Sequence, residues 1–256
     1  MKTKKGGAPL RRVGRAEKSL SAENVSIVLV EPISPGNIGS VARAMKNTGF
    51  TRLKLINPCE HKCNESFSMA CKAHEVLLGA EVFPDIASAT KGGSVIVGTT
   101  RRKGRLRYPV LTLDEAIPGI AKLASGNKVD ILFGREDKGL KNEEIQKCGI
   151  LVEIPVSPGY PSLNLSHAFF IVCYSLFRTE NPAEPVIKAA PKEETERMYE
   201  HLESALRSLG YGEAGGEGLL SAIMRSFRRL FGRTALMQKE INMLRGIFTQ
   251  IKERTR

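Results

Sequence analysis

The sequence predicts an α/β protein in which a parallel sheet flanked by helices is followed by a small all-helical domain. Short apolar runs alternate with helical patterns from residue 25 to about residue 180, and this alternation is typical of a parallel sheet with helices on its faces. Beyond residue 192 three helical patterns follow without strands between them. A chain of 256 residues also exceeds the usual size of one domain, which favours a large unit plus a small one.

The expected strands are short apolar runs bounded by turn residues. They cover residues 25–30, 53–58, 94–98, 129–133 and 150–156. Helical patterns separate them: one begins near Ser40, and others cover 67–78, 85–90 and 142–147. Thr112 is the expected N-cap of a further helix that ends at Ala124. The helix expected at 163–177 is apolar on nearly every side, which predicts that it is buried.

Composition divides the chain into four segments. Residues 1–22 read as a basic flexible arm and 23–180 as the α/β domain. The prolines between residues 181 and 192 indicate a linker, and 193–256 form the helical domain. In that domain Met237, Ile241, Leu244, Phe248 and Ile251 step by four and three residues, which predicts a small core or a subunit contact, with the core favoured.

The net charge of +12 and the pI of about 9.6 favour a polyanionic partner. Residues 1–20 carry seven Lys and Arg against one acidic residue, and residues 219–256 carry nine against two. No apolar run approaches the roughly 20 residues that span a bilayer, and the basic N-terminus lacks the apolar stretch of a signal peptide. We therefore expect a cytoplasmic protein with no membrane partner.

The five cysteines are an odd number in a chain expected to be cytoplasmic, which argues against a disulfide framework. Cys59, Cys63, Cys71 and His74 invite comparison with a zinc site. Their spacing departs from paired Cys-x2-Cys motifs, and the last two lie in a helical stretch. We expect reduced thiols and no metal.

The end of the first strand carries the most informative motif. Residues 31–49 read EPISPGNIGSVARAMKNTG, a glycine-containing turn that leads into a helix. Free backbone N–H groups at a helix N-terminus make a site for a polar or anionic ligand. Ser40, Arg43 and Asn47 follow at i, i+3 and i+7, so we expect them on one helical face.

Two later motifs complete a resemblance. They are FGREDKGL at 133–140 and IPVSPGYPSLNLS at 154–166. Together with Asn37, Gly39, Arg43 and Asn47, they resemble, in order and distance, the SpoU/TrmH branch of the SPOUT RNA 2′-O-ribose methyltransferases over residues 24–180. The resemblance implies a C-terminal trefoil knot in the α/β domain and S-adenosylmethionine as cofactor. Within the branch, the chain is most similar to enzymes that methylate cytidine or uridine at position 32 of the tRNA anticodon loop.

The same resemblance implies the roles of individual residues. The cofactor pocket would be lined by Thr99, Thr100, Gly134, Ile154, Leu163 and Ser166. The catalytic set would be Asn37, Arg43, Glu136, Ser162 and Asn164, with Arg43 and Asn47 also contacting RNA. A guanidinium rarely deprotonates in a protein, so we expect Arg43 to hold a phosphate and stabilise charge on the 2′-oxygen rather than act as the base.

The helical domain is expected to bind the body of tRNA. Arg225, Arg228, Arg229 and Arg233 fall at i, i+3, i+4 and i+8, and beside them Phe227, Leu230 and Phe231 are expected to pack inward. Residues 230–236 and 244–247 resemble the C-terminal extension of the position-32 enzymes. The resemblance also implies a homodimer, with 163–177 and 237–251 as candidate contacts.

The sequence can be compared with three alternatives to a tRNA methyltransferase of this family. A Rossmann-type methyltransferase needs G-x-G-x-x-G after the first strand and a carboxylate ending the second, and the sequence has neither. A non-catalytic RNA-binding protein is possible, either with a KH-type G-x-x-G at Gly36–Gly39 or as an inactive family member, although all five catalytic residues are present. Ribosomal RNA is the alternative substrate.

Overall fold

The computed structural model describes residues 22–101, 109–179, 188–213 and 216–255. Seven parallel strands form one sheet in the order β3-β2-β1-β6-β4-β7-β5. Nearly all of the expected basic arm, 1–22, lies outside the described residues. The strands are β1 (Val25–Val30), β2 (Arg52–Ile56), β3 (Glu81–Phe83), β4 (Val95–Thr99), β5 (Leu111–Thr112), β6 (Val129–Phe133) and β7 (Ile150–Glu153).

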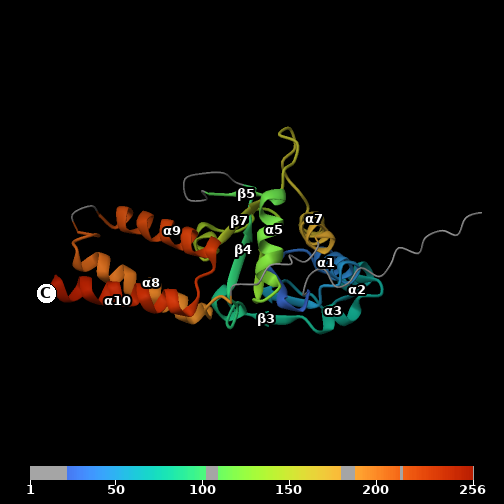
Figure 1. Cartoon of the computed structure of the whole chain (residues 1–256). Helices are drawn as coiled ribbons and strands as arrows, with labels where there is room; N and C mark the ends of the chain where they lie inside the picture. The colour runs from blue at the N-terminus through green and yellow to red at the C-terminus, as the bar shows by residue number, and fades with distance from the viewer. Residues whose placement is uncertain (1–21, 102–108, 180–187, 214–215, 256) are drawn as a thin grey trace, which may run out of the picture.

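Helices cover both faces of the sheet (Figure 1). One core cluster holds residues of α1 (Pro35–Thr48), α3 (His74–Leu78), α5 (Leu113–Ala124) and α7 (Leu165–Arg178). The other face is covered by α4 (Ile86–Ala89) and α6 (Asn142–Gln146), while α2 (Asn64–Ala70) packs beside α1. The α/β class and the helical C-terminal part are confirmed.

The five expected strands are present, with boundaries shifted by up to three residues. α1 begins at Pro35, before the expected Ser40, because Ser34 accepts a hydrogen bond from the N–H of Asn37 and Pro35 suits the first turn. The helix expected at 67–78 is two helices, broken at Cys71, whose φ is 53°. That left-handed backbone cannot continue an α-helix.

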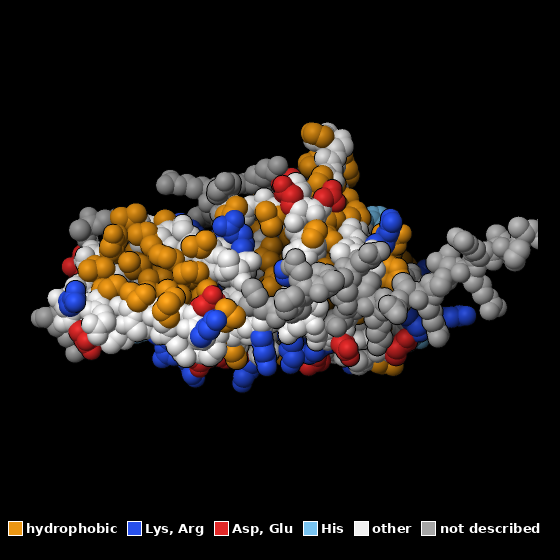
Figure 2. Space-filling model, in the orientation of Figure 1, with side chains coloured by type: hydrophobic (Ala, Val, Ile, Leu, Met, Phe, Trp, Pro, Cys, Tyr) orange, Lys and Arg blue, Asp and Glu red, His pale blue; other side chains and the backbone are white. Residues whose placement is uncertain are grey.

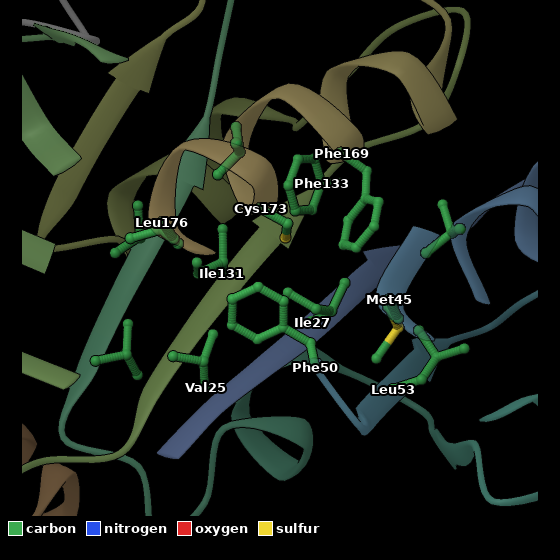
Figure 3. Close-up of a cluster of buried hydrophobic side chains, with 14 of the residues drawn as sticks. Val25, Ile27, Met45, Phe50, Leu53, Ile131, Phe133, Phe169, Cys173 and Leu176 are labelled. Carbon is green, nitrogen blue, oxygen red and sulfur yellow. The ribbon is translucent and has the colours of Figure 1, made fainter. Parts of the chain in front are cut away.

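The larger core lies between the sheet and α1, α5 and α7 (Figure 3). Ile27, Phe133 and Phe169 are fully buried there, and the rings of Phe133 and Phe169 meet edge to face at 5.7 Å. Gly39 lets α1 approach α2, since a Cβ at this position would lie 2.2 Å from the carbonyl oxygen of Ser66. The motif glycine is therefore needed for packing.

α7 corrects the expectation that 163–177 is wholly buried. Phe170, Tyr174 and Phe177 are 40%, 44% and 49% exposed, and the first two rings stack at 5.6 Å. One face of α7 packs on the sheet and the other presents an aromatic stripe to solvent.

The helical unit consists of α8 (Lys192–Ser208), α9 (Gly216–Thr234) and α10 (Gln238–Arg254), and it extends away from the sheet (Figure 1). Its own core includes Ile241 and Phe248, so the stripe expected at 237–251 forms a core. The expected linker lies outside the described residues from 181 to 187; Ala189 and Ala190 are buried. Among the described helices, none is long and apolar enough to cross a membrane.

Candidate active site

A cavity lies at the carboxyl ends of β4, β6 and β7, where a parallel sheet usually binds its ligand. Its empty space measures about 850 Å³, which includes open solvent at its mouth. Its wall includes Thr99 at the end of β4, Gly134 immediately after β6 and Ile154 immediately after β7. Three segments far apart in the sequence therefore meet in one site.

The structure places five of the six expected cofactor residues in the wall of this cavity. They are Thr99, Thr100, Gly134, Ile154 and Leu163. Ser166 is not among the lining residues; its N–H and hydroxyl both donate to Oδ1 of Asn164, at 2.8 and 2.6 Å. Of the expected catalytic residues, Glu136 and Ser162 line the cavity.

The loop after β6 needs glycine at two places. A Cβ on Gly134 would lie 2.2 Å from the carbonyl carbon of Gly139 and the nitrogen of Leu140. Gly139 itself has a φ of 63°, which favours glycine. The loop folds back on itself to form one wall of the cavity, which explains the two glycines of the FGREDKGL motif.

Arg135 braces this loop, a role that the sequence did not indicate. Its side chain is buried and donates to Glu31 at 2.6 Å and to both carboxylate oxygens of Glu144, at 2.8 and 3.0 Å. These hydrogen bonds raise the pKa of Arg135 further and lower the pKa of Glu31. Since Glu31 follows β1, the arginine ties the ends of two adjacent strands together.

A chain of polar contacts runs beside the cavity from α1 to α7. The Asn37 amide donates to Oε1 of Glu136 at 3.0 Å and accepts from Nδ2 of Asn164 at 2.9 Å. Glu136 also accepts from the backbone N–H groups of Ile33 and Ser34. Three expected catalytic residues, separated by up to 127 positions, therefore meet in one network.

The N-terminus of α1 differs from the expected ligand site. The Gly36 N–H donates to Glu65 at 3.0 Å, and the Asn37 N–H donates to the Ser34 hydroxyl at 3.2 Å. The chain's own side chains thus satisfy these two donors, and a carboxylate already occupies the favourable end of the helix dipole. The expected site for a polar or anionic ligand therefore does not include these two N–H groups in the structure.

Arg43 lies farther along α1 and does not line the cavity. Its guanidinium is exposed and contacts Sγ of Cys71 at 3.4 Å. Asn47 is exposed one turn later, while Val41 and Met45 are buried on the opposite side. The expected polar face of α1 is confirmed, but it is separate from the cavity of its own chain.

The four arginines of α9 do not form one exposed stripe. Arg229 is 6% exposed and donates to the carbonyl oxygens of Cys148 and Ile145, so its predicted contact with RNA is wrong. Arg228 pairs with Glu196 at 2.8 Å and lies over the ring of Tyr199. Arg225 is half-buried and Arg233 exposed.

The expected inward packing on α9 also holds only in part. Phe227 and Phe231 contact the core of the helical unit, but Leu230 is 47% exposed. Hydrophobic side chains gather over the visible face of this unit (Figure 2).

The cysteines are free thiols, and all five lie in the described part of the chain. Burial raises the pKa of Cys148 to about 12 and that of Cys173 well above its ordinary value. Cys71 contacts Arg43, and the His74 ring contacts the carbonyl oxygen of Phe67. In the described ranges, no three Cys, His, Asp or Glu side chains converge as metal ligands do.

Comparison with known proteins connects this geometry to a family. Residues 24–174 match the SpoU rRNA Methylase family, and residues 193–256 match the C-terminal domain of the tRNA methyltransferase TrmJ. The tRNA (cytidine/uridine-2′-O-)-methyltransferase TrmJ of Citrobacter koseri is 37% identical over 91% of this chain and 98% of its own.

Two solved structures extend the match to the fold. TrmJ from Z. mobilis ZM4 has a TM-score of 0.72 and 33% identity, covering 89% of this chain and 98% of its own. A probable methylase family protein from Haemophilus influenzae has a TM-score of 0.59 and 32% identity, covering 91% and 97%. With the strand-end cavity and the polar network in place, these matches show that the chain belongs to the SpoU methylase family.

Proposed function

We propose that the protein transfers the methyl group of S-adenosylmethionine to a ribose 2′-oxygen of tRNA, at the cytidine or uridine in position 32 of the anticodon loop. The observation that carries this proposal is the network of Glu136, Asn37 and Asn164 beside the strand-end cavity. The names of the curated relatives, which cover nearly the whole chain, support the substrate.

The residues of the cavity fit this cofactor. Ile154 and Leu163 offer apolar surface for an adenine ring, and Thr99 and Ser162 offer hydroxyl groups. Gly134 brings backbone to the wall where any side chain would clash. When bound, S-adenosylmethionine supplies a methyl group on a positively charged sulfur that can leave without the help of a metal.

The chain's own residues would position the ribose. Asn37 and Asn164 hold each other's amide groups at a fixed separation, and Ser162 stands at the cavity wall. This preorganisation lowers the entropic part of the barrier. Glu136 fixes Asn37 from the opposite side. Arg43 would hold the neighbouring phosphate and stabilise negative charge as it develops on the 2′-oxygen.

The position of Arg43 supports a homodimer. The side chain is exposed and does not line the cavity of its own chain; in a dimer, a second subunit could bring its Arg43 to each site. The exposed stripe of Phe170, Tyr174 and Phe177 on α7 provides an apolar surface for such a contact. Light scattering at micromolar concentration should therefore give twice the mass of 28.1 kDa; a monomer would contradict this arrangement.

The helical unit would bind the body of tRNA through exposed cations. Arg233 is exposed and Arg225 half-buried on α9, and Lys239 is exposed on α10. Such contacts neutralise phosphates without reading sequence. The enzyme would act in the cytoplasm, where tRNA is processed.

The description of the family that matches residues 24–174 names ribosomal RNA, which makes ribosomal RNA the second candidate substrate. Mass spectrometry of nucleosides from a strain that lacks the gene distinguishes a tRNA substrate from a ribosomal RNA substrate. We expect loss of a 2′-O-methylated cytidine or uridine from tRNA, with ribosomal RNA unchanged. Loss from ribosomal RNA alone would establish the second candidate.

A further inference from the structure

The helical unit (188–213 and 216–255) contacts the sheet unit (22–101 and 109–179) through the end of α9. Arg229 reaches out of α9 and donates to the carbonyl oxygen of Cys148 at 2.7 Å and to that of Ile145 at 3.0 Å. Ile145 lies in the last turn of α6 and Cys148 lies two residues beyond its end, and carbonyl groups at a helix C-terminus attract a cation. The buried guanidinium of one unit thus caps a helix of the other.

One turn later the two backbones touch. A Cβ on Gly232 would lie 2.3 Å from Cα of Gly149, and a Cβ on Gly149 would lie 2.8 Å from Cα of Gly232. Backbone cannot give way as the end of a flexible side chain can, so any side chain at either position must separate the units. Gly149 immediately precedes β7, whose other end supplies Ile154 to the cavity.

A second attachment lies at the start of α8. The Lys192 N–H donates to the carbonyl oxygen of Gly93 at 3.2 Å, and Glu193 accepts from the Gly92 N–H at 3.0 Å. The Lys192 side chain also bonds the Thr90 hydroxyl. Because the helical unit is attached at two different places on the sheet unit, it resists rotation relative to the sheet unit. A single attachment would allow that rotation.

The dimensions of the helical unit make its orientation matter. α8 has 17 residues and therefore reaches about 25 Å from its start, so a rotation of 10° there displaces its far end by about 4 Å. A displacement of about 1 Å of a reacting group can already cost on the order of a hundredfold in rate.

We infer that Arg229 and the contact between Gly149 and Gly232 form a joint that sets the orientation of the helical unit, so that bound tRNA presents its target ribose to the cavity. We assign them a positioning role, because none of the three lines the strand-end cavity. The inference rests on the proposed tRNA substrate. It adds the residues that set the orientation of the helical unit, which binds tRNA, relative to the strand-end cavity.

The test compares two glycine substitutions in the same helix of the full-length enzyme. Gly232→Ala inserts a methyl group into the joint, whereas Gly218→Ala adds the same group where nothing lies within 4 Å. Alanine favours a helix over glycine by about 1 kcal/mol, so neither change weakens α9 itself. The measurements are single-turnover methylation at saturating tRNA, cofactor and tRNA affinity, and hydrogen exchange of peptides covering 142–152 and 188–195.

We expect Gly232→Ala to lower the single-turnover rate at least tenfold, with cofactor affinity within twofold and tRNA affinity within threefold of wild type. Exchange should quicken in both peptides, and Gly218→Ala should match wild type throughout. An unchanged rate, or a loss of cofactor affinity that explains the lower rate, would overturn the inference. If wild type and Gly218→Ala both leave tRNA unmethylated, the proposed function fails instead.

Arg229→Met provides a second variant in case Gly232→Ala does not fold. Its single-turnover rate should fall while its cofactor and tRNA affinities stay near wild type. Arg229→Lys should recover part of the rate, because an ammonium can still donate to the two carbonyls. Equal rates for Met and Lys at this position would contradict a positioning role.

Discussion

At the scale of single residues, the central question is how Arg43 acts from outside its own cavity. We expect Arg43→Ala to lower the methylation rate by at least about a hundredfold, the effect typical of losing one group that stabilises developing charge. Cofactor affinity should stay within twofold, because Arg43 is not part of the cavity wall. Single-turnover assays and calorimetric titration with S-adenosylmethionine measure the two quantities.

Lys46→Ala is the matched control for this variant. Lys46 is an exposed cation on the same helix, and its ammonium pairs with Glu75. It should keep the wild-type rate, which separates loss of a specific guanidinium from loss of positive charge on α1. Weaker cofactor binding in Arg43→Ala would contradict the placement of Arg43 outside the cavity.

The hydrogen-bonded ion pair of Glu31 with Arg135 should make the stability of the folded protein depend on pH. Hydrogen bonding from Arg135, aided by the charges of Arg135 and Lys141, holds the pKa of this carboxyl below its ordinary 4.5. A folded-state pKa below the unfolded value contributes stability above about pH 4.5, and this contribution is lost as pH falls through the folded pKa. Glu31→Gln should therefore be less stable than wild type at pH 7, with a difference that shrinks below pH 4.5. Urea unfolding at pH 7, 5, 4 and 3 measures it; a constant difference would exclude the ion pair as its source.

The sequence motifs predicted some of the residues in the candidate site but not the burial of Arg229. Glu136 and Ser162 were expected from motifs, and the structure brings them to one cavity. The burial of Arg229 could not be predicted, because its spacing on α9 is the same for an exposed and a buried arginine. Its partners are carbonyl groups more than 80 positions away, and backbone acceptors leave no mark in a sequence.

At the scale of elements, the loop from 134 to 140 depends on its first glycine. Gly134→Ala places a Cβ against the backbone of Gly139 and Leu140, so the loop must open and the cavity wall must shift. We expect cofactor affinity to fall at least tenfold by calorimetry. Gly119→Ala, in α5, adds the same group to open space and should bind the cofactor as wild type does. Equal affinity of both variants would show that the loop does not form the cofactor site.

The strands that the sequence predicts are those buried on both faces. β1, β4 and β6 carry runs of apolar residues, and all residues of β1 and β6 are buried. β3 and β5 were missed because they have three and two residues and are at most half-buried. Strands this short are ordered by pairing with β2 and β7, which is tertiary information. The trefoil knot implied by the resemblance stays a prediction, since no local pattern encodes the passage of a chain through a loop.

At the scale of the whole molecule, tRNA should engage the helical unit electrostatically. Replacing both Arg225 and Arg233 with Gln should weaken tRNA binding and reduce the slope of log affinity against log salt by about one unit per lost phosphate contact. Filter binding from 50 to 300 mM salt gives both quantities. Arg207→Gln is the control, because Glu203 and Glu217 already engage that guanidinium. An unchanged slope in the double variant would place the RNA elsewhere.

The most direct test of the proposed activity is methylation of unmodified tRNA by the purified protein. The protein is incubated with S-adenosylmethionine and tRNA transcripts, and the methylated nucleotide is located by nuclease digestion and mass spectrometry. The proposal predicts one 2′-O-methyl group, on the cytidine or uridine at position 32. A methyl group on a base, a modified ribose only in ribosomal RNA, or no transfer at any salt concentration would contradict it.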